Sequence, residues 1–431
     1  MARPKPFELV LELAGASRFV NALTVAAIGT AVLSTALQRT IGAAGLIAIL
    51  STLGVLAVVS LIARRDSITW LTILPFSLLV FLGWAALSIF WSSYQWATFW
   101  GLGYLAIYTL LGIYIALVRD LIQIVRAFGD VLRFVLASSI ALEIVSGLLI
   151  DAPIRFLGIE GKLATLGPIQ GLLGTRNQIA LISLIALITF ATELRTRSIS
   201  RGLAIGSISL ALLVLALSRS PVMGAVFLIV GAAAAALYGI RRVPAARRTA
   251  WQLVLLGALL VGVIVAWALR TQLISLFSAS GDLDYRLNVW RGLWDLIPVH
   301  PVEGWGWTGY WQSYLTPFTS FAPSGSVRVP TSATNAFIDV WFQLGLVGIA
   351  IFVGMVGLTF VRSWLLAGQR RSIVFAWPAL VLVVLILTGL TESSLLVEYG
   401  WLTFVVCCVK AASELSWRRA FARPLEPEPL D

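Results

Sequence analysis

Long apolar runs recur twelve times along this sequence, with charged residues, glycines and prolines between them. A helix of about 20 apolar residues crosses the hydrocarbon core of a bilayer, where lipid cannot satisfy the polar groups of an irregular backbone. Of the 431 residues, 59% are hydrophobic and 12% are charged, whereas a soluble chain carries about 25% charged residues. The sequence therefore excludes a water-soluble protein and predicts an all-α, polytopic membrane protein.

The predicted spans form one transmembrane domain, residues 1–411, because the length of such a chain sets the number of helices in a bundle. The tail at 412–431 is short, charged and proline-rich, and we expect it to be disordered and cytoplasmic. Spans are expected at 19–37, 41–63, 69–90, 96–117, 127–150, 177–194, 202–217, 221–239, 250–270, 335–361, 373–390 and 398–411.

Basic residues are distributed unevenly between the two sides of the predicted bundle. If both termini are cytoplasmic, 21 lysines and arginines lie in inside segments and nine lie in outside segments. Because cytoplasmic loops carry the excess of basic residues, the sequence predicts cytoplasmic termini and an external loop at 271–334. The same bias, with attraction to anionic lipids, accounts for most of the net charge of +11, and no nucleic-acid module is visible.

The single histidine and two cysteines leave little scope for metal or disulfide chemistry. Cys407 and Cys408 are adjacent in an apolar run, where neighbours on a helix diverge by about 100° and do not easily bridge. With His300 as the only imidazole, no cluster has the spacing of zinc ligands. We therefore expect no bound metal and no cofactor.

The external loop at 271–334 is long, and long loops in compact proteins usually carry function. A helical wheel at about 100° per residue predicts an amphipathic helix over 284–297, with Arg291 on its polar stripe. Arg286 falls on the apolar face beside Trp290. It either reaches lipid headgroups or projects into a polar cavity inside the bundle, and we favour the cavity.

Two further external arginines stand beside predicted helix N-termini. Arg176 lies in GTRNQIA, where Asn177 or the threonine before the arginine can cap the helix. Arg219 lies in LSRSP, where Ser220 can cap a helix that begins at Pro221. Free backbone N–H groups and a guanidinium together suit an anion such as phosphate. The alternative is that these arginines only anchor helix ends among lipid headgroups.

Tryptophans crowd the external loop, among them Trp290 and Trp305. Such residues form the aromatic belt that membrane proteins place at the lipid–water interface. They can equally present a flat apolar platform to sugar rings or to a polyprenyl chain. The sequence leaves both interpretations open.

Four motifs, in order over residues 170–360, resemble the bacterial O-antigen ligase and polysaccharide polymerase superfamily, including its exopolysaccharide polymerase-like members. They are GTRNQIA before one span, the LSRS turn, YRLNVW with HPVEGWGWTGYW in the external loop, and ATNAFIDVWFQLGLVGIAIF leading into the next span. The resemblance implies a GT-C-like bundle of about twelve transmembrane helices. It also implies an inverting, metal-independent glycosyltransferase at the outer face of the bacterial cytoplasmic membrane, with a glycan donor on an undecaprenyl-type diphosphate lipid and a glycan or lipid acceptor.

By position, Arg219 and Arg286 match the family's two functional arginines, which the resemblance assigns to binding and stabilising the departing diphosphate. This agrees with the need for positive charge where negative charge develops. The residues expected to bind substrate are Arg176, Asn177, Trp290, Trp305 and Asn335.

One position departs from the family pattern. Where the family commonly has His-Asn, this chain has Thr334 and Asn335, and threonine is no general base near neutral pH. Asp339 follows one helical turn later inside a predicted span, where a carboxylate is costly enough to suggest a function. Either another group takes the role of the family's histidine, or the acceptor needs no activation, or this member is impaired. We take Asp339 as the preferred substitute, the alternative for this residue being a hydrogen bond between helices.

Other classes of protein stay open. A lipid-linked oligosaccharide flippase or another transporter could also have twelve spans, but its charges would be expected along a midplane path rather than at the outer face. A peptidoglycan polymerase of the shape and division family has similar spans and a similar outer loop, but a different sequence pattern. The choice between ligase and polymerase, the identity of the glycan, and the oligomeric state are also open.

Overall fold

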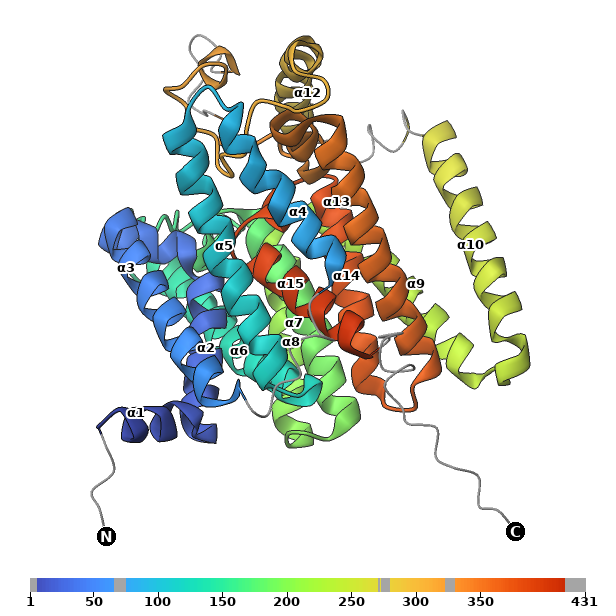
Figure 1. The fold of residues 1–431 in the computed structure, drawn as a ribbon. Helices are drawn as coiled ribbons and strands as arrows, with labels where there is room; N and C mark the ends of the chain where they lie inside the picture. Colours follow the sequence, from blue (N-terminus) through green and yellow to red (C-terminus); the bar gives the residue numbers. More distant parts are fainter. Residues whose placement is uncertain (1–5, 66–74, 270–271, 273–279, 322–329, 415–431) are drawn as a thin grey trace, which may run out of the picture.

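The computed structural model describes residues 6–65, 75–269, 272, 280–321 and 330–414. In this part the molecule is a helical bundle (Figure 1), as the apolar runs predict. Its α-helices are α1 (Pro6–Gly15), α2 (Ser17–Val32), α3 (Ser34–Ala63), α4 (Phe76–Leu87), α5 (Gln95–Val118), α6 (Leu121–Ile144), α7 (Arg176–Thr196), α8 (Arg201–Ser218), α9 (Pro221–Arg242), α10 (Ala245–Ala268), α12 (Ser280–Leu296), α13 (Ala336–Gln369), α14 (Ala376–Gly389) and α15 (Glu398–Glu414).

Seven helices of the described part are long and apolar enough to cross a membrane, namely α3, α5, α6, α7, α8, α9 and α13. Shorter apolar helices, including α2, α4 and α14, accompany them. The chain is therefore a multi-pass membrane protein. The expected first run, 19–37, is divided, because α2 ends at Val32 and α3 begins at Ser34. Gly42, with a φ of 74°, interrupts the helical path of α3 at the start of the second run. Residues 69–74 of the third run lie outside the described residues, and the count of about twelve spans stays a prediction.

The centre of the bundle is formed by α7, α14 and α15, whose residues are mostly buried. Trp377 of α14 donates its indole N–H to Thr189 Oγ1 at 2.9 Å, and Trp401 of α15 donates to Thr109 Oγ1 at 2.8 Å. An indole N–H in an apolar interior needs such a partner, so these bonds fix α14 on α7 and α15 on α5. In contrast, α10 stands apart from the bundle beyond α9 (Figure 1).

The segment that follows α12 docks against a break in α13. Gly345 interrupts that helix with a φ of 66° and a ψ of −167°. The amide of Leu346 then donates to the carbonyl oxygen of Pro301 at 2.9 Å. A Cβ at Gly345 would lie 2.1 Å from the carbonyl oxygen of Val302, so this close approach of two backbones requires glycine. The docking holds the segment after α12 against the bundle.

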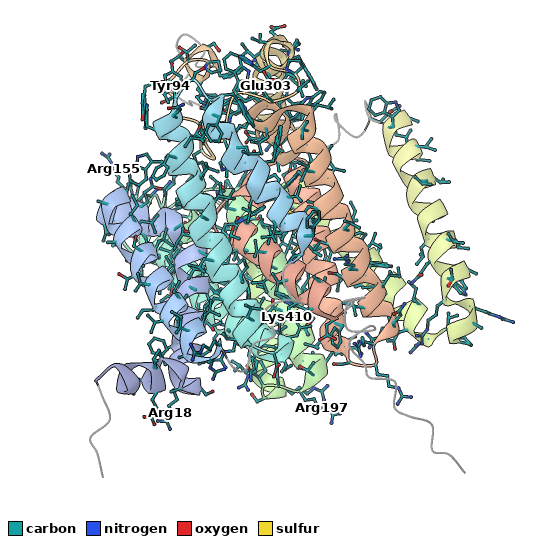
Figure 2. The ribbon with its side chains drawn as sticks, in the orientation of Figure 1. Arg18, Tyr94, Arg155, Arg197, Glu303 and Lys410 are labelled. Atoms are coloured by element: carbon teal, nitrogen blue, oxygen red, sulfur yellow. The ribbon has the colours of Figure 1, made fainter. Side chains whose placement is uncertain are left out.

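The two ends of the bundle carry different parts of the chain. The helices α1 and α12 lie at opposite ends (Figure 1). Arg18, Arg197 and Lys410 lie toward the α1 end, whereas Tyr94 and Glu303 lie at the α12 end (Figure 2). The first and last described helices therefore reach the same side, as the charge distribution predicts. Which side faces the cytoplasm stays a prediction.

Candidate functional site

A cavity of about 500 Å³ opens beside α12, and most side chains that line it are polar or charged. We call it the polar cavity. Its walls come from residues within 160–178, Tyr285 of α12, and residues within 309–310, 331–339 and 392–399. In a membrane protein, a cavity with charged walls is a candidate substrate site.

A chain of hydrogen bonds joins three of the sequence motifs at the wall of the polar cavity. Arg286 Nη2 donates to Glu392 Oε1 at 2.9 Å. Asn177 Nδ2 donates to the same oxygen at 2.8 Å, and Ser220 Oγ donates to Asn177 Oδ1 at 2.8 Å. Helix α12, the GTRNQIA motif and the LSRS turn thus meet around one carboxylate.

The helical wheel predicted over 284–297 is confirmed. Leu293 of α12 is buried, and the Arg286 side chain on the same face is only 13% exposed. Arg286 Nη1 donates to the carbonyl oxygen of Thr334 at 3.4 Å. Arg291 is exposed and donates to Asn288 Oδ1 at 2.9 Å. Of the two interpretations of Arg286, the structure shows the one in which it points into the protein.

Arg219 ends α8 in the left-handed conformation, with a φ of 48° and a ψ of 35°. Its side chain is exposed and forms no hydrogen bond or ion pair with another described residue. Ser220 caps α9 by accepting from the amide of Met223 at 3.4 Å, and Pro221 is the first residue of α9, as predicted. Ser220 therefore connects the Arg219 turn to the hydrogen-bond chain, while the guanidinium stays accessible to a ligand.

Arg176 is the first residue of α7 and lines the polar cavity. Thr175 caps this helix by accepting from the amide of Gln178 at 3.2 Å. Asn177 does not cap it, because its side chain is engaged by Glu392 instead. The N-terminal backbone amides of α7 add to the positive potential at this wall.

Asn335 fixes the start of α13. Its Oδ1 accepts from the amides of Phe337 at 2.9 Å and Ile338 at 3.2 Å. Its Nδ2 donates to the carbonyl oxygen of Leu390 at 3.0 Å. Asn335 therefore ties α13 to the end of α14, and a role in binding substrate stays a prediction.

Asp339 is 1% exposed and accepts from three donors. Its Oδ1 accepts from Trp311 Nε1 at 2.9 Å and from Gln343 Nε2 at 2.8 Å, and its Oδ2 accepts from the amide of Ala333 at 3.2 Å. These bonds order the loop that precedes α13. Asp339 also borders the polar cavity, so its proposed catalytic role stays a prediction.

Trp290 and Trp305 pack beside the polar cavity but are not among the described residues that line it. Trp290 Nε1 donates to the carbonyl oxygen of Ala333 at 2.8 Å, and Trp305 Nε1 donates to that of Leu296 at 3.2 Å. Both belong to one hydrophobic cluster with Leu293. Their observed contacts hold α12 in place, and the sugar-platform hypothesis stays a prediction.

Three carboxylates of the polar cavity were not among the predicted site residues, and they are Glu160, Glu392 and Glu398. Glu392 and Glu398 both lie in TESSLLVEY, which links α14 to α15. Glu398 is 5% exposed, and its Oε1 accepts from the hydroxyl of Tyr104 at 3.0 Å. The sequence feature that could have indicated Glu392 and Glu398 was a pair of acidic residues between two apolar runs. Sequence alone does not distinguish such a pair from ordinary charges at helix ends.

His300 lies in a turn that is distinct from the walls of the polar cavity. Its Nδ1 donates to Glu303 Oε1 at 3.0 Å, and this bond lowers the pKa of the Glu303 carboxyl. The amide of Gly304 donates to the carbonyl oxygen of His300 at 3.0 Å and closes the turn. In the described part of the chain, no group of three or more histidine, cysteine, aspartate or glutamate side chains is placed to hold a metal ion.

The sequence profile of the O-antigen ligase family matches residues 203–353. The resemblance to the O-antigen ligase and polysaccharide polymerase superfamily is confirmed. The O-antigen ligase match extends from α8 into α13 and contains Arg219, Arg286 and Asp339. Glu392 and Glu398 lie beyond it. No curated protein matches the chain.

Proposed function

We propose that this protein is a glycosyltransferase of the O-antigen ligase and polymerase type. It transfers or polymerises a glycan from an undecaprenyl-type diphosphate donor onto an acceptor hydroxyl at the outer face of the bacterial cytoplasmic membrane. Its product is a surface polysaccharide such as O-antigen, exopolysaccharide or capsule. The family match supports the class of enzyme. The observation that carries the proposal is the ion pair of Arg286 with Glu392, a residue that lines the polar cavity together with Arg176.

The departing diphosphate needs positive charge where its negative charge develops. Arg286 meets this need, because a guanidinium can grip two phosphate oxygens and remains charged when partly buried. Glu392 forms an ion pair with that guanidinium. We expect the diphosphate to displace the Glu392 carboxylate from it. Arg176 at the cavity wall and Arg219 at the neighbouring turn supply further charge for the same anion.

The arginines also define the expected course of the reaction. Because they supply the charge that a metal ion supplies in many glycosyltransferases, we expect transfer to need no metal. A single displacement, in which the acceptor hydroxyl attacks opposite the departing diphosphate, inverts the anomeric carbon. Such a step needs no covalent intermediate with the protein.

Deletion of the gene tests this function. Cells without the protein should lose the finished polysaccharide and accumulate the lipid-linked glycan on the outer leaflet, where periodate oxidises it in intact cells. Wild-type protein should restore the polysaccharide, and Arg286→Lys at equal membrane level should restore little. Accumulation on the inner leaflet would instead identify a flippase and overturn the proposed transferase.

Cysteine labelling tests the outward orientation of the site. Cys407 and Cys408 are 0% and 2% exposed, so they contribute little background. Val302→Cys, at a position 51% exposed in the external loop, should react with an impermeant maleimide in intact cells. Arg197→Cys, at the opposite end, should react only after permeabilisation. The reverse pattern would place the polar cavity on the cytoplasmic side and exclude transfer at the outer face.

A further inference from the structure

Glu398 is a buried carboxylate that the chemistry described so far does not use. It begins α15 in the left-handed conformation, with a φ of 48°. A glutamate adopts this strained conformation only where its surroundings hold it. The adjoining turn is tightly packed, since a Cβ added at Gly400 would lie 1.9 Å from the carbonyl oxygen of Ser394. This packing holds Glu398 at the wall of the polar cavity.

The groups that face Glu398 are tyrosine hydroxyls. Tyr104 of α5 donates to Oε1 at 3.0 Å, and Tyr310, of the segment after α12, lines the polar cavity beside the carboxyl. Tyr108 of α5 and the adjacent Tyr399 lie close enough to interact electrostatically with it. No lysine, arginine or histidine in the described part of the chain forms an ion pair with Glu398.

The other carboxylates at the cavity walls are already engaged. Glu392 is bound to Arg286, and Glu160 pairs with Lys162. Asp339 accepts from three donors. A carboxylate whose charge is met by a cation or by several donors is a poor proton acceptor, whereas one held by hydroxyls away from water is a better one. Among the described acidic residues of the cavity, Glu398 is therefore the best placed to take a proton.

We propose that Glu398 accepts the proton of the acceptor hydroxyl during glycan transfer, an inference that rests on the proposed function. The acceptor oxygen forms a bond to the anomeric carbon while the bond between that carbon and the diphosphate oxygen breaks. The electron pair of the broken bond leaves with the diphosphate, whose charge Arg286 meets. The acceptor proton passes to the Glu398 carboxylate and then to water. This supplies the general base that Thr334 cannot be.

Glu398→Gln tests the proposal, because glutamine keeps the size of the side chain and a carbonyl oxygen for the tyrosines but cannot take the proton. The assay uses purified protein in proteoliposomes with the lipid-linked glycan isolated from the deletion cells. We expect kcat to fall about 100- to 10,000-fold. The KM for the donor should stay within about twofold of the wild-type value, since Glu398 does not bind the diphosphate.

Two readouts separate a proton acceptor from a structural residue. Wild-type transfer should decline at acidic pH as Glu398 becomes protonated, and Glu398→Gln should lack this limb of the profile. Added formate should restore part of the activity of Glu398→Ala, because a small carboxylate can occupy the space left by the side chain. Size-exclusion profiles establish that each variant is folded.

Glu303→Gln is the matched control, since it removes a carboxylate from the His300 turn, outside the polar cavity, and should transfer at the wild-type rate. If Glu398→Gln transfers within about threefold of wild type, or if formate restores nothing to Glu398→Ala, the proposal is overturned. A complete lack of transfer by the wild-type protein with intact donor would instead refute the proposed function, and the role of Glu398 with it.

Discussion

Two arginine–glutamate pairs in this protein have different surroundings. Arg286 and Glu392 meet at 2.9 Å at the polar cavity, with side chains 13% and 24% exposed. Arg133 of α6 and Glu193 of α7 also form an ion pair, but the Glu193 side chain is 0% exposed. Neither member of the second pair lines the polar cavity.

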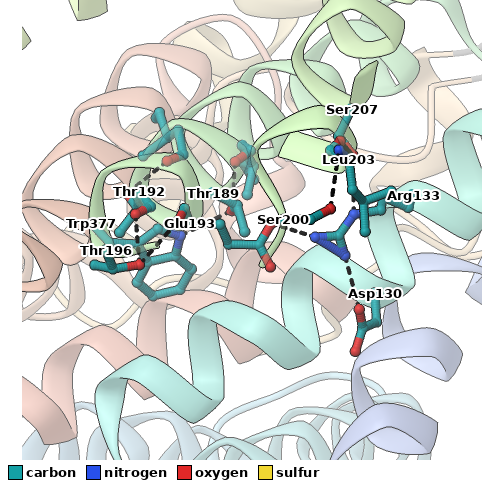
Figure 3. A network of polar contacts seen from close by, with 12 residues as sticks. Asp130, Arg133, Thr189, Thr192, Glu193, Thr196, Ser200, Leu203, Ser207 and Trp377 are labelled. Atoms are coloured by element: carbon teal, nitrogen blue, oxygen red, sulfur yellow. Dashed lines mark hydrogen bonds and ion pairs between the residues drawn. The ribbon is translucent and has the colours of Figure 1, made fainter. Parts of the chain in front are cut away.

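Figure 3 shows how the protein encloses the second pair. Arg133 Nε donates to Ser207 Oγ of α8 at 3.1 Å, and Nη1 donates to Asp130 Oδ1 at 2.8 Å. Gly129 leaves room for the carboxylate, because a Cβ there would lie 2.4 Å from Glu193 Oε1. The pair therefore connects α6, α7 and α8 through contacts made entirely by the protein.

The comparison shows that an arginine–glutamate pair serves a different purpose according to whether a ligand can reach its carboxylate. The Arg133 side chain is 15% exposed, but a ligand cannot reach the fully buried Glu193 carboxylate, so this pair contributes to the packing of three helices. A ligand can reach the Arg286 pair, and Glu392 already shares its oxygen between Arg286 and Asn177. An anion can thus replace the carboxylate at the open pair but not at the enclosed one. The predictions below test this distinction.

Arg133→Met should have the largest effect, a loss of about 3–5 kcal/mol in the free energy of unfolding, because it leaves Glu193 buried without its cation. Denaturation of the protein in detergent micelles measures this. The double variant Arg133→Met with Glu193→Leu should recover most of the stability, since two apolar side chains can replace an enclosed pair. A single variant as stable as the wild type would show that the enclosed pair does not support the bundle.

Arg286→Lys should lower glycan transfer about 30- to 1000-fold, equivalent to about 2–4 kcal/mol of transition-state stabilisation, while the protein stays folded. Lysine keeps the charge but loses the planar fork that grips two phosphate oxygens. Arg291→Lys is the matched control, because it lies on the same helix but is exposed, and its transfer rate should not change. Equal losses for the two variants would remove the case for Arg286 as a site residue.

Asp339→Asn should lower the stability of the adjoining loop by about 1–3 kcal/mol. The backbone N–H of Ala333 donates to Asp339, and in the variant the side-chain N–H₂ group, itself a donor, would face this N–H. Hydrogen exchange in the segment around Trp311 measures the effect. This variant separates loop ordering from catalysis. A loss of transfer as large as that of Arg286→Lys, with hydrogen exchange unchanged, would favour the catalytic role first predicted for Asp339.

Asn177→Ala should have the smallest effect, a loss of about 0.5–1.5 kcal/mol in the free energy of donor binding. This corresponds to roughly a 2- to 10-fold rise in the KM for the donor. The variant removes one hydrogen bond to Glu392 and one from Ser220, but leaves Arg286 with its carboxylate. Steady-state transfer at varied donor concentration gives the value. A change in kcat without a change in KM would contradict this positioning role.

The sequence by itself determined the features that depend on neighbouring residues. Apolar runs of span length predicted the helical bundle, and the wheel over α12 separated Arg286 from Arg291. Ser220 and Pro221 predicted the start of α9. Each of these is a local property, because helix periodicity and capping are decided within one or two turns of chain.

Only the tertiary structure decided which side chains share the polar cavity. Arg286 and its partner Glu392 are 106 positions apart, and Glu398 is 294 positions from Tyr104. No local pattern encodes such pairs, because they depend on how separate helices pack. The same holds for Trp290, whose indole bonds to the backbone of Ala333 rather than lining the cavity. Helix periodicity shows which face a residue occupies, whereas packing in three dimensions determines what that face meets.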